Sequence, residues 1–431
     1  MKINKITIFE HNKLIVDKEY NGVIFKESYY NQLIKFYNAQ KEKDSLYTLI
    51  ANGIKFKEYV GVIQIGNLQI EVLPKADKDS TDENKWRKLL INMLREIELQ
   101  LIKAPSSSWL KLIPNSILEL YFEIFISELE YLIRTGLIKQ YHPVTSNQAV
   151  LKGSLYFPKH ITHNLVHKEL FYTRNITYNY DHIWHSIFRE TIQLIKTLTD
   201  NAHLHNRIKV LELYFPEVQK RTITAQTFAN LKYNRKTEGY RAATEIAKLL
   251  LLNFHPDLSS GTNHILALMF DMNKLWEKFI YITLRKQFIR NQSKYNVYAQ
   301  RKKLFWSSEH NKREIKPDII IQEQTNEANK QTDCYILDTK WKVPENINAI
   351  PSDSDLMQIF AYANIFNTHK NALIYPGNPK NSKKGHYESP EDTQKETIGC
   401  DTILLECKEN IKEFQESIYS TISEWLSQKM E

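Results

Sequence analysis

Lys316-Pro317-Asp318-Ile319-Ile320-Ile321-Gln322 is the first half of the stretch that decides the fold of this chain, and Cys334-Tyr335-Ile336-Leu337-Asp338-Thr339-Lys340-Trp341-Lys342 is the second. Each half contains a short run of β-branched, aliphatic or aromatic residues. Residues 323–333 between them are all polar except Ala328. Two apolar runs separated by a polar loop predict two strands joined as a hairpin.

The charged residues of this hairpin are expected to meet at one end of a sheet. Side chains along a strand alternate between its two faces, so Asp338 and Lys340 project to the same side. In an antiparallel hairpin, Asp318 at the start of the first strand lies beside Asp338 at the end of the second. Two close carboxylates are hard oxygen ligands of the kind that suit Mg²⁺. Lys340 can orient an attacking water and offset the charge that develops on a phosphate.

A surface hairpin with an ordinary Asp–Lys pair is the alternative interpretation, and three features weigh against it. A Pro-Asp pair opens the first strand, an apolar run leads directly into Asp338, and a helix is expected from about Ser354 to Asn367. Gln358 and Tyr362 are four residues apart and share a face of that helix. An upstream helix over 270–280 carries Glu277 at the edge of its apolar face, in line with Asn273. By itself Glu277 would be a solvated helix residue, but before Asp318, Asp338 and Lys340 it becomes a candidate fourth member.

Length and composition bound the remaining possibilities. A chain of 431 residues with 42% hydrophobic residues indicates two or three domains with sizeable cores. A net charge of +8 is compatible with a nucleic-acid partner. Three cysteines, no signal-peptide core in the first ten residues and no apolar run of membrane-spanning length predict a protein of a reducing cytoplasm with no membrane partner. The sequence contains no phosphate-binding Gly-x-x-x-x-Gly-Lys-[Ser/Thr] motif, so we expect no nucleotide bound by this chain itself.

Three regions of an α/β (α+β) chain follow from the patterns. Residues 1–101 are predicted to form a mostly β domain, with a hairpin at Gly66-Asn67 and a helix that begins near a capping box of Ser80 and Glu83. Residues 102–245 are predicted to be mixed and mainly helical, including a helix from Ser116 that ends near Gly136. Residues 246–431 are predicted to form a domain with a central mixed sheet flanked by helices.

Two further groups of residues invite a functional interpretation. Lys380, Lys383 and Lys384 lie in a loop that is either simply solvated or in contact with a DNA backbone. The histidines of the middle region have spacings that suggest a helix face but lack a matching carboxylate or cysteine, so they are interpreted as solvated or packed residues. These are His160, His163, His167, His182 and His185.

The motifs together resemble a known family. Lys316-Pro317-Asp318, the Asp338-Thr339-Lys340 triplet and the preceding helix with Glu277 resemble the PD-(D/E)xK nuclease superfamily. Over most of its length the chain is similar to the McrC family, the nuclease subunits of McrBC-type (5-methylcytosine) restriction systems. Trp276 and Trp341 stand where Phe and Tyr are usual in that family. The matching residues are 61–63, 70–75, 134–137, 151–153, 270–279, 316–318, 338–342 and the pair Gln358 and Tyr362. The last three groups are the more specific ones, and the N-terminal matches are softer.

The resemblance implies a division of labour. It implies that Asp318, Asp338, Lys340 and Glu277 form the catalytic set, with Asp318, Asp338 and the backbone carbonyl of Thr339 as ligands of one or two Mg²⁺ ions. It also implies an endonuclease that cuts modified double-stranded DNA together with a McrB-like AAA+ GTPase ring, which docks on the N-terminal region and whose hydrolysis it stimulates. Two alternatives stay open: a stand-alone nuclease of repair or mobile-element maintenance, and a catalytically silent regulator of the GTPase.

Overall fold

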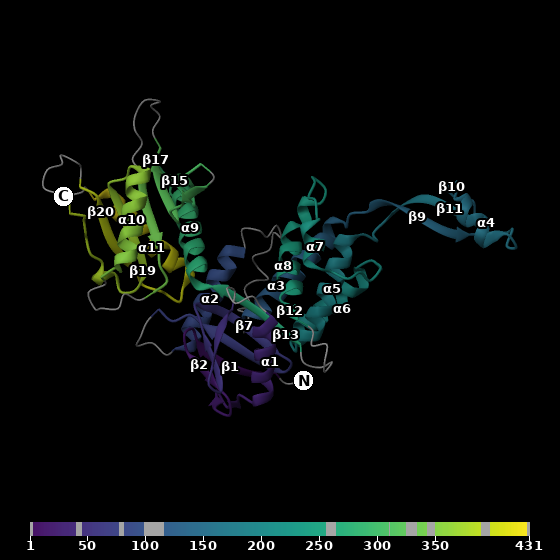
Figure 1. Cartoon of the computed structure of the whole chain (residues 1–431), viewed down its shortest axis with the longest axis horizontal. Coiled ribbons are helices and arrows are strands. Elements are labelled where there is room, and N and C mark those ends of the chain that lie inside the picture. Colours follow the sequence, from purple (N-terminus) through teal and green to yellow (C-terminus); the bar gives the residue numbers. More distant parts are fainter. Residues whose placement is uncertain are drawn as a thin grey trace. The chain divides into compact units, whose positions relative to one another are not determined.

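The computed structural model describes residues 3–39, 45–76, 82–98, 116–255, 264–309, 311–324, 334–342, 350–388 and 397–428. The chain divides into two compact units (Figure 1). One unit comprises residues 4–100 and 269–431, and the other comprises 1–3 and 101–268. We call the first the nuclease unit, after the predicted nuclease motifs that it contains, and the second the middle unit. Among the described residues, no helix has the length and apolar character needed to cross a membrane.

The N-terminal part of the nuclease unit is built on three paired strands. β1 lies parallel to β8, and β8 pairs with β7 in the hairpin predicted at Gly66-Asn67. β2, β6 and β5 form a small antiparallel sheet beside them. The elements are β1 Asn4–Phe9, β2 Lys13–Ile15, β3 Glu19–Tyr20, β4 Val23–Ile24, α1 Glu27–Ala39, β5 Tyr47–Ile50, β6 Gly53–Phe56, β7 Tyr59–Ile65, β8 Leu68–Leu73 and α2 Glu83–Glu98.

The C-terminal part of the same unit contains a five-stranded mixed sheet in the order β14-β17-β18-β19-β20. β17 and β18 are the two predicted strands and pair antiparallel, whereas β18, β19 and β20 are parallel. The elements are α9 Met272–Arg290, β14 Tyr295–Ala299, β15 Lys303–Ser307, β16 Lys312–Ile315, β17 Ile319–Glu323, β18 Cys334–Thr339, α10 Asp353–Phe366, β19 Lys370–Pro376, the 3₁₀ turn η4 Pro379–Asn381, β20 Gly399–Leu405 and α11 Ile411–Ser427.

Helices cover both faces of this sheet. Ile359 and Tyr362 of α10 pack in one core cluster with Ile320, Ile336 and Leu373 from the sheet. On the other face, Tyr335 of β18 contacts Trp425 of α11, and Phe414 of α11 stacks on Trp276 and Phe279 of α9. Residues of even number in β17 and β18 therefore face α10, as the period of two requires.

The helix α2 belongs to the same packed body as the nuclease sheet. Trp86 of α2 packs edge-to-face on Trp341, which follows β18 directly. Glu96 of α2 pairs with Lys286 of α9 and accepts a hydrogen bond from Gln415 of α11. The two units divide between residues 100 and 101, where the first predicted limit lies. The N-terminal and C-terminal regions, predicted as separate domains, cluster in one unit, and the predicted limit at 245 falls inside helix α8 (Arg241–Leu252).

The middle unit is mainly helical and carries a long β-hairpin. β9 and β11 pair antiparallel over nine residues each, and β10 and α4 lie within the connection between them. The elements are α3 Ile117–Thr135, β9 Gln140–Gln148, β10 Ser154–Leu155, α4 Phe157–Asn164, β11 Phe171–Asn179, α5 Ile183–Leu198, α6 Ala202–Tyr214, α7 Ala225–Ala229, the 3₁₀ turn η3 Glu238–Tyr240, α8 Arg241–Leu252 and β12 Phe254–His255; β13, Ile265–Asp271, runs across the division between the units.

Helix α3 begins and ends at the residues that the sequence predicts. Ser116 accepts a hydrogen bond from the backbone N–H of Glu119 and so caps α3, while Gly136 ends that helix with a φ of 95°. Asp271 caps α9 through the N–H groups of Asn273 and Lys274. The predicted α/β fold class is confirmed. The expected capping box at Ser80 lies outside the described residues.

Candidate nuclease site

Asp318 and Asp338 meet at one end of the sheet. Ile319 pairs with Leu337, so the next pair in this antiparallel register brings Asp318 opposite Asp338 on the α10 face. The Oδ2 atom of Asp318 accepts hydrogen bonds from the backbone N–H of Thr339 at 2.8 Å and from its hydroxyl at 3.0 Å. These two bonds hold the start of β17 to the end of β18, where the predicted triplet begins.

Burial gives these carboxyl groups unusual acid strengths. Asp338 has no exposed surface, and burial together with the charge of Asp318 raises its pKa to about 7. Burial also raises the pKa of Asp318, against the lowering effect of its hydrogen bonds from Thr339. The strands thus hold two like charges close together in a place that disfavours charge.

Lys340 is the cation that faces this pair. Its Nζ atom lies 2.8 Å from Oδ2 of Asp338 and donates a hydrogen bond to Oε1 of Gln358 at 3.0 Å. Gln358 in turn donates to the hydroxyl of Tyr362 at 2.6 Å. Burial by itself lowers the pKa of Lys340, but the carboxylates of Asp338 and Asp318 raise it above its ordinary value. The structure therefore brings together Lys340, Gln358 and Tyr362 as the sequence predicts.

Glu277 lies near the same end of the sheet, on α9. Its Oε1 atom accepts a hydrogen bond from Nε2 of Gln300 at 2.6 Å. Burial and the charge of Asp318 raise the pKa of Glu277. Gln300 also donates its backbone N–H to the carbonyl of Asp318 at 3.0 Å and accepts from Nζ of Lys316 at 3.4 Å. Gln300 and Lys316 thus connect Glu277 to Asp318.

A second set of contacts supports the strand end from the α9 face. The backbone N–H of Trp341 donates to Oδ1 of Asn273 at 3.2 Å, and its Nε1 donates to Oε1 of Glu10 at 2.8 Å. Glu10, at the end of β1, also accepts from the N–H of Lys75 at 2.9 Å, and burial raises its pKa to about 7. The sequence patterns did not indicate Glu10 or Gln300. The one available signal was Lys316, which adjoins the Pro-Asp pair and donates to Gln300.

The donor set at Asp318 and Asp338 fits a hard cation. The Oδ1 atom of Asp338 is buried and has no hydrogen-bond partner among the residues that the structure describes. A buried carboxylate oxygen without a donor is costly unless a cation or a proton joins it. In the described part of the chain, no group of three His, Cys, Asp or Glu side chains is arranged to hold a metal ion. A cation here would have these two carboxylates as its side-chain ligands, completed by backbone carbonyl and water oxygens.

The three loop lysines lie elsewhere on the sheet. Lys380, Lys383 and Lys384 are exposed, and Lys383 exchanges backbone hydrogen bonds with Thr402 of the edge strand β20. β19 stands between β20 and β18, so this loop runs along the far edge from β17. No described contact joins these lysines to the carboxylates, and their role on DNA stays a prediction.

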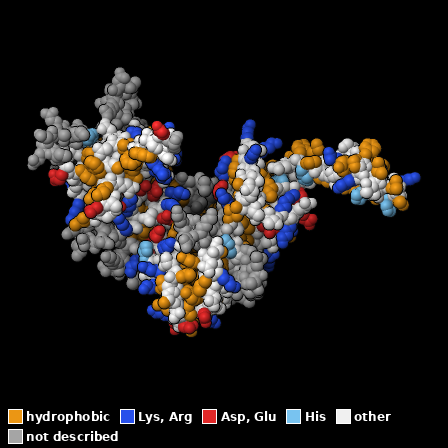
Figure 2. All heavy atoms as spheres, in the orientation of Figure 1, with side chains coloured by type: hydrophobic (Ala, Val, Ile, Leu, Met, Phe, Trp, Pro, Cys, Tyr) orange, Lys and Arg blue, Asp and Glu red, His pale blue; other side chains and the backbone are white. Residues whose placement is uncertain are grey.

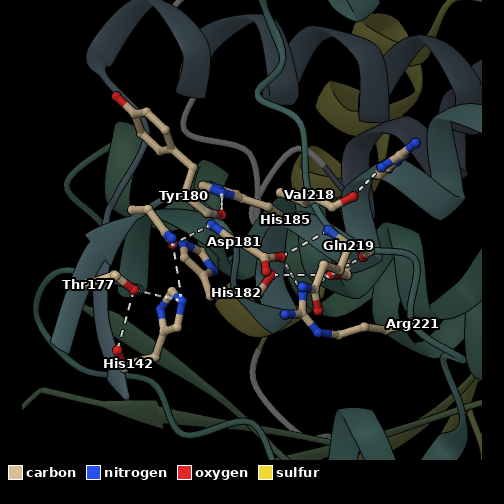
Figure 3. A network of polar contacts seen from close by, with 12 residues as sticks. His142, Thr177, Tyr180, Asp181, His182, His185, Val218, Gln219 and Arg221 are labelled. Atoms are coloured by element: carbon tan, nitrogen blue, oxygen red, sulfur yellow. Dashed lines mark hydrogen bonds and ion pairs between the residues drawn. The ribbon is translucent and has the colours of Figure 1, made fainter. Parts of the chain in front are cut away.

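The histidines of the middle unit form packed or solvated groups rather than a metal site. His182 and His185 are buried with their rings 3.9 Å apart, in a network of polar contacts that Figure 3 shows. In that network Asp181 accepts from Arg221 at 2.8 Å and from the N–H of Gln219 at 2.9 Å. The predicted helical spacing of the other three fails at His167, because α4 ends at Asn164.

Comparisons with known proteins identify a family and a similar fold. A family model described as McrBC 5-methylcytosine restriction system component matches residues 54–376. The fold is similar to that of a chain from a refined half-complex of the tetradecameric assembly of Thermococcus gammatolerans McrB AAA+ hexamers with bound McrC. The TM-score is 0.64 and the identity 19%, over 98% of this chain and 100% of that chain.

Two other results complete the comparisons. A chain of the Thermococcus gammatolerans McrBC complex is 22% identical with a TM-score of 0.46, over 68% of this chain and 89% of that chain. No curated protein sequence matches the chain. The family model covers most of the sequence, including the strands that carry Asp318 and Asp338, and the match confirms the predicted family. The chain belongs to the McrBC 5-methylcytosine restriction system component family.

Proposed function

We propose that this protein is the McrC-like nuclease subunit of its restriction system, an Mg²⁺-dependent endonuclease that cuts modified duplex DNA. The observation that carries the proposal is the convergence of Asp318, Asp338 and Lys340 at one sheet end. Lys340 lies 2.8 Å from a fully buried carboxylate whose other oxygen has no partner among the described residues. An ion pair with Lys340 leaves that oxygen without a partner, whereas a bound cation would contact it.

The side chains have distinct roles in this proposal. Asp318, Asp338 and the carbonyl of Thr339 would hold Mg²⁺. Bound Mg²⁺ supplies positive charge where negative charge develops on the phosphate. Lys340, kept protonated by its carboxylate neighbours, donates to the phosphate or to the attacking water, and Gln358 fixes the direction of its Nζ atom. Glu277, with its raised pKa, is suited to hold a proton at the edge of the site.

A partner GTPase is part of the proposal. The sequence lacks a phosphate-binding loop of the Gly-x-x-x-x-Gly-Lys-[Ser/Thr] type. The family is that of a restriction system component, and the similar solved chain comes from an assembly of McrB AAA+ hexamers with bound McrC. We therefore propose that a McrB-like AAA+ GTPase ring binds nucleotide and that this chain binds the ring, stimulates its hydrolysis and cuts the DNA.

Asp338→Ala tests the site assignment. Cleavage by the complex with the GTPase and Mg²⁺ should be lost, because one of the two carboxylate ligands is removed. Stimulation of GTP hydrolysis should be kept, because Asp338 lies inside the nuclease sheet. Gel assays of cleavage and phosphate-release assays of the same preparations measure both. Cleavage at the rate of the unaltered complex would refute the site.

Lys340→Ala separates the lysine from the ligands. Cleavage should again be lost, but Mg²⁺ affinity measured by calorimetry should fall much less than in Asp338→Ala, since Lys340 does not ligate the metal. An equal loss of affinity in both variants would contradict this role. Robust cleavage of unmodified duplex by the unaltered chain alone would favour the stand-alone nuclease, and GTPase stimulation without any cleavage would favour the silent regulator.

A further inference from the structure

The hairpin of β15 and β16 exposes apolar side chains to an unusual degree. Leu304, Phe305 and Trp306 are consecutive and are 53%, 56% and 51% exposed. The two strands pair antiparallel from Lys303 with Ile315 to Ser307 with Lys312, with an irregularity between the pairs of Leu304 and Trp306. Single exposed apolar residues are ordinary, but three large ones in a row on one short ribbon indicate a surface that binds something. We call residues 303–315 the ribbon.

The ribbon is anchored at its base. Ile315 packs against the core cluster that contains Ile320, Ile359 and Tyr362. Nζ of Lys303 donates to the carbonyl of Ile365 in α10 at 3.2 Å and lies 4.7 Å from the ring centre of Phe366. The ribbon is therefore held in place beside α10, the helix that carries Gln358.

Positive charge surrounds the exposed apolar residues. Residues 301–316 include six lysines and arginines but two glutamates, Glu309 and Glu314. Glu314 pairs with Lys302 at 3.0 Å, whereas Lys312 and Arg313 form no ion pair with any residue that the structure describes. Figure 2 shows hydrophobic side chains together with lysine and arginine side chains over the region where Figure 1 labels β15 and α10.

The pairing of the strands places an aromatic ring and a cation together. Trp306 is paired with Arg313, and directly paired residues of an antiparallel ribbon project to the same face. A face with an exposed indole and a guanidinium is suited to a partner that offers both phosphate charge and flat apolar surface. Duplex DNA has this combination, because the base edges in its major groove carry apolar groups and its phosphates bind arginine.

Both ends of the ribbon lead into the candidate nuclease site. β16 ends at Ile315, and the chain continues through Lys316 and Pro317 to Asp318. The segment before β15 includes Gln300, which holds Glu277 and donates to the carbonyl of Asp318. Asp318 follows Arg313 by five positions, a span of at most about 18 Å of chain. A duplex bound at the carboxylates would thus lie within reach of the ribbon.

We propose that the ribbon is a DNA-binding element that enters the major groove of the duplex beside the phosphate to be cut. This inference rests on the proposed function. The major groove admits a two-stranded ribbon. Lys312 and Arg313 contact phosphates, and Phe305 and Trp306 contact the apolar edges of the bases and sugars. The phosphate contacts position the duplex without selecting a particular sequence.

Salt dependence of DNA binding tests the charged half of the proposal. The full chain is titrated against a fluorescein-labelled duplex in metal-free buffer, which prevents cleavage, between about 50 and 200 mM salt. The variant Lys312→Ala/Arg313→Ala should lower the slope of log affinity against log salt by about two, since each phosphate contact contributes about 0.9. The matched control Lys13→Ala/Lys412→Ala removes two exposed lysines elsewhere in the same unit and should leave the slope unchanged.

The apolar half is tested by Trp306→Ala. Affinity should fall about tenfold with the salt slope unchanged, because an apolar contact with the groove is lost but no charge is removed. The control Ile289→Ala removes an exposed apolar side chain of α9 and should bind as the unaltered chain does. Unchanged thermal unfolding of each variant checks that the fold is intact.

The outcomes separate this inference from the proposed function. If the unaltered chain binds DNA and the ribbon variants bind it with the same affinity and the same salt slope, the inference about the ribbon is overturned but the proposed function is not. Failure of the unaltered chain and of its complex with the GTPase to bind DNA would overturn both. Loss of GTPase stimulation with unchanged DNA binding would also overturn the proposal, because the ribbon would then be a surface for the partner protein.

Discussion

Two buried polar groups of this molecule differ in how their charges are compensated. In the nuclease unit, Asp318, Asp338 and Glu277 converge with raised pKa values, and Oδ1 of Asp338 has no partner among the described residues. In the middle unit, Asp181 is held by Arg221 and Gln219, and hydrogen bonds from both keep its pKa low despite some burial.

The histidines beside Asp181 complete the contrast. Burial lowers the pKa of His182, and burial together with His182 lowers that of His185 to about 3, so both rings are neutral near pH 7. His185 contacts the carbonyl of Tyr180 and the hydroxyl of Tyr240. Nδ1 of His182 has no described partner, but an unpaired neutral nitrogen costs far less than an unpaired carboxylate. The network is therefore stabilising as it stands, whereas the carboxylate cluster is stable only with a proton or a cation.

Asp338→Asn should give the largest effect that this comparison predicts. Cleavage by the complex should fall about a thousandfold or more. The folded pKa of about 7 lies above the ordinary value of 3.8, so the folded state binds more protons between these values and loses stability as pH rises from about 4 to about 7. The variant escapes this loss. Its free energy of unfolding should exceed that of the unaltered protein by about 2–4 kcal/mol at pH 8 and by little at pH 4.

Urea unfolding of the metal-free proteins at both pH values measures that difference. A variant that is less stable than the unaltered protein at pH 8 would place Asp338 among the structural residues, like the Asp181 network, and would remove the contrast.

His185→Ala should have the opposite pattern. Its side chain is fully buried and makes two hydrogen bonds, so the variant should lose about 3 kcal/mol of unfolding free energy. Cleavage per folded molecule should not change, because the ring takes no part in the chemistry. Leu213→Ala, a change at an exposed residue of the same unit, should alter stability by less than about 0.5 kcal/mol. A selective loss of cleavage in folded His185→Ala would contradict the structural role.

Magnesium should stabilise one unit through the carboxylate cluster. At a concentration about a hundred times the dissociation constant, Mg²⁺ should add about 2.7 kcal/mol to the unfolding free energy. The effect should vanish in Asp338→Asn and persist in His185→Ala, and differential scanning fluorimetry with and without Mg²⁺ measures it. Equal stabilisation of all three proteins would show that the cation binds elsewhere.

Arg221→Ala should have the smallest effect. The pair with Asp181 is partly exposed, so its removal should cost about 1 kcal/mol. Arg221→Lys should recover part of that loss, because the positive charge is retained. Thermal unfolding of both variants distinguishes them, and a loss of several kcal/mol would mean that Asp181 is as strongly dependent on its partner as Asp338 is on a cation.

The sequence by itself determined the parts of the site that follow from short-range periodicity. Asp338 and Lys340 share a face because side chains of a strand alternate, and Asp318 joins them because β17 and β18 are adjacent in an antiparallel hairpin. Gln358 and Tyr362 share a face because they are one helical turn apart.

Only the tertiary structure decided which distant residues support these groups. The contact of Glu10 with Trp341 joins positions 331 residues apart, and that of Gln300 with Glu277 joins a loop to a helix. The long β9–β11 hairpin and the ribbon were not predicted, because the β9 sequence is mostly polar and the apolar residues of β15 are consecutive rather than alternating. The periodicity of apolar residues indicates on which face of its own helix or strand a residue lies. Which element covers that face depends on the packing of the whole unit, and no local pattern of residues encodes it.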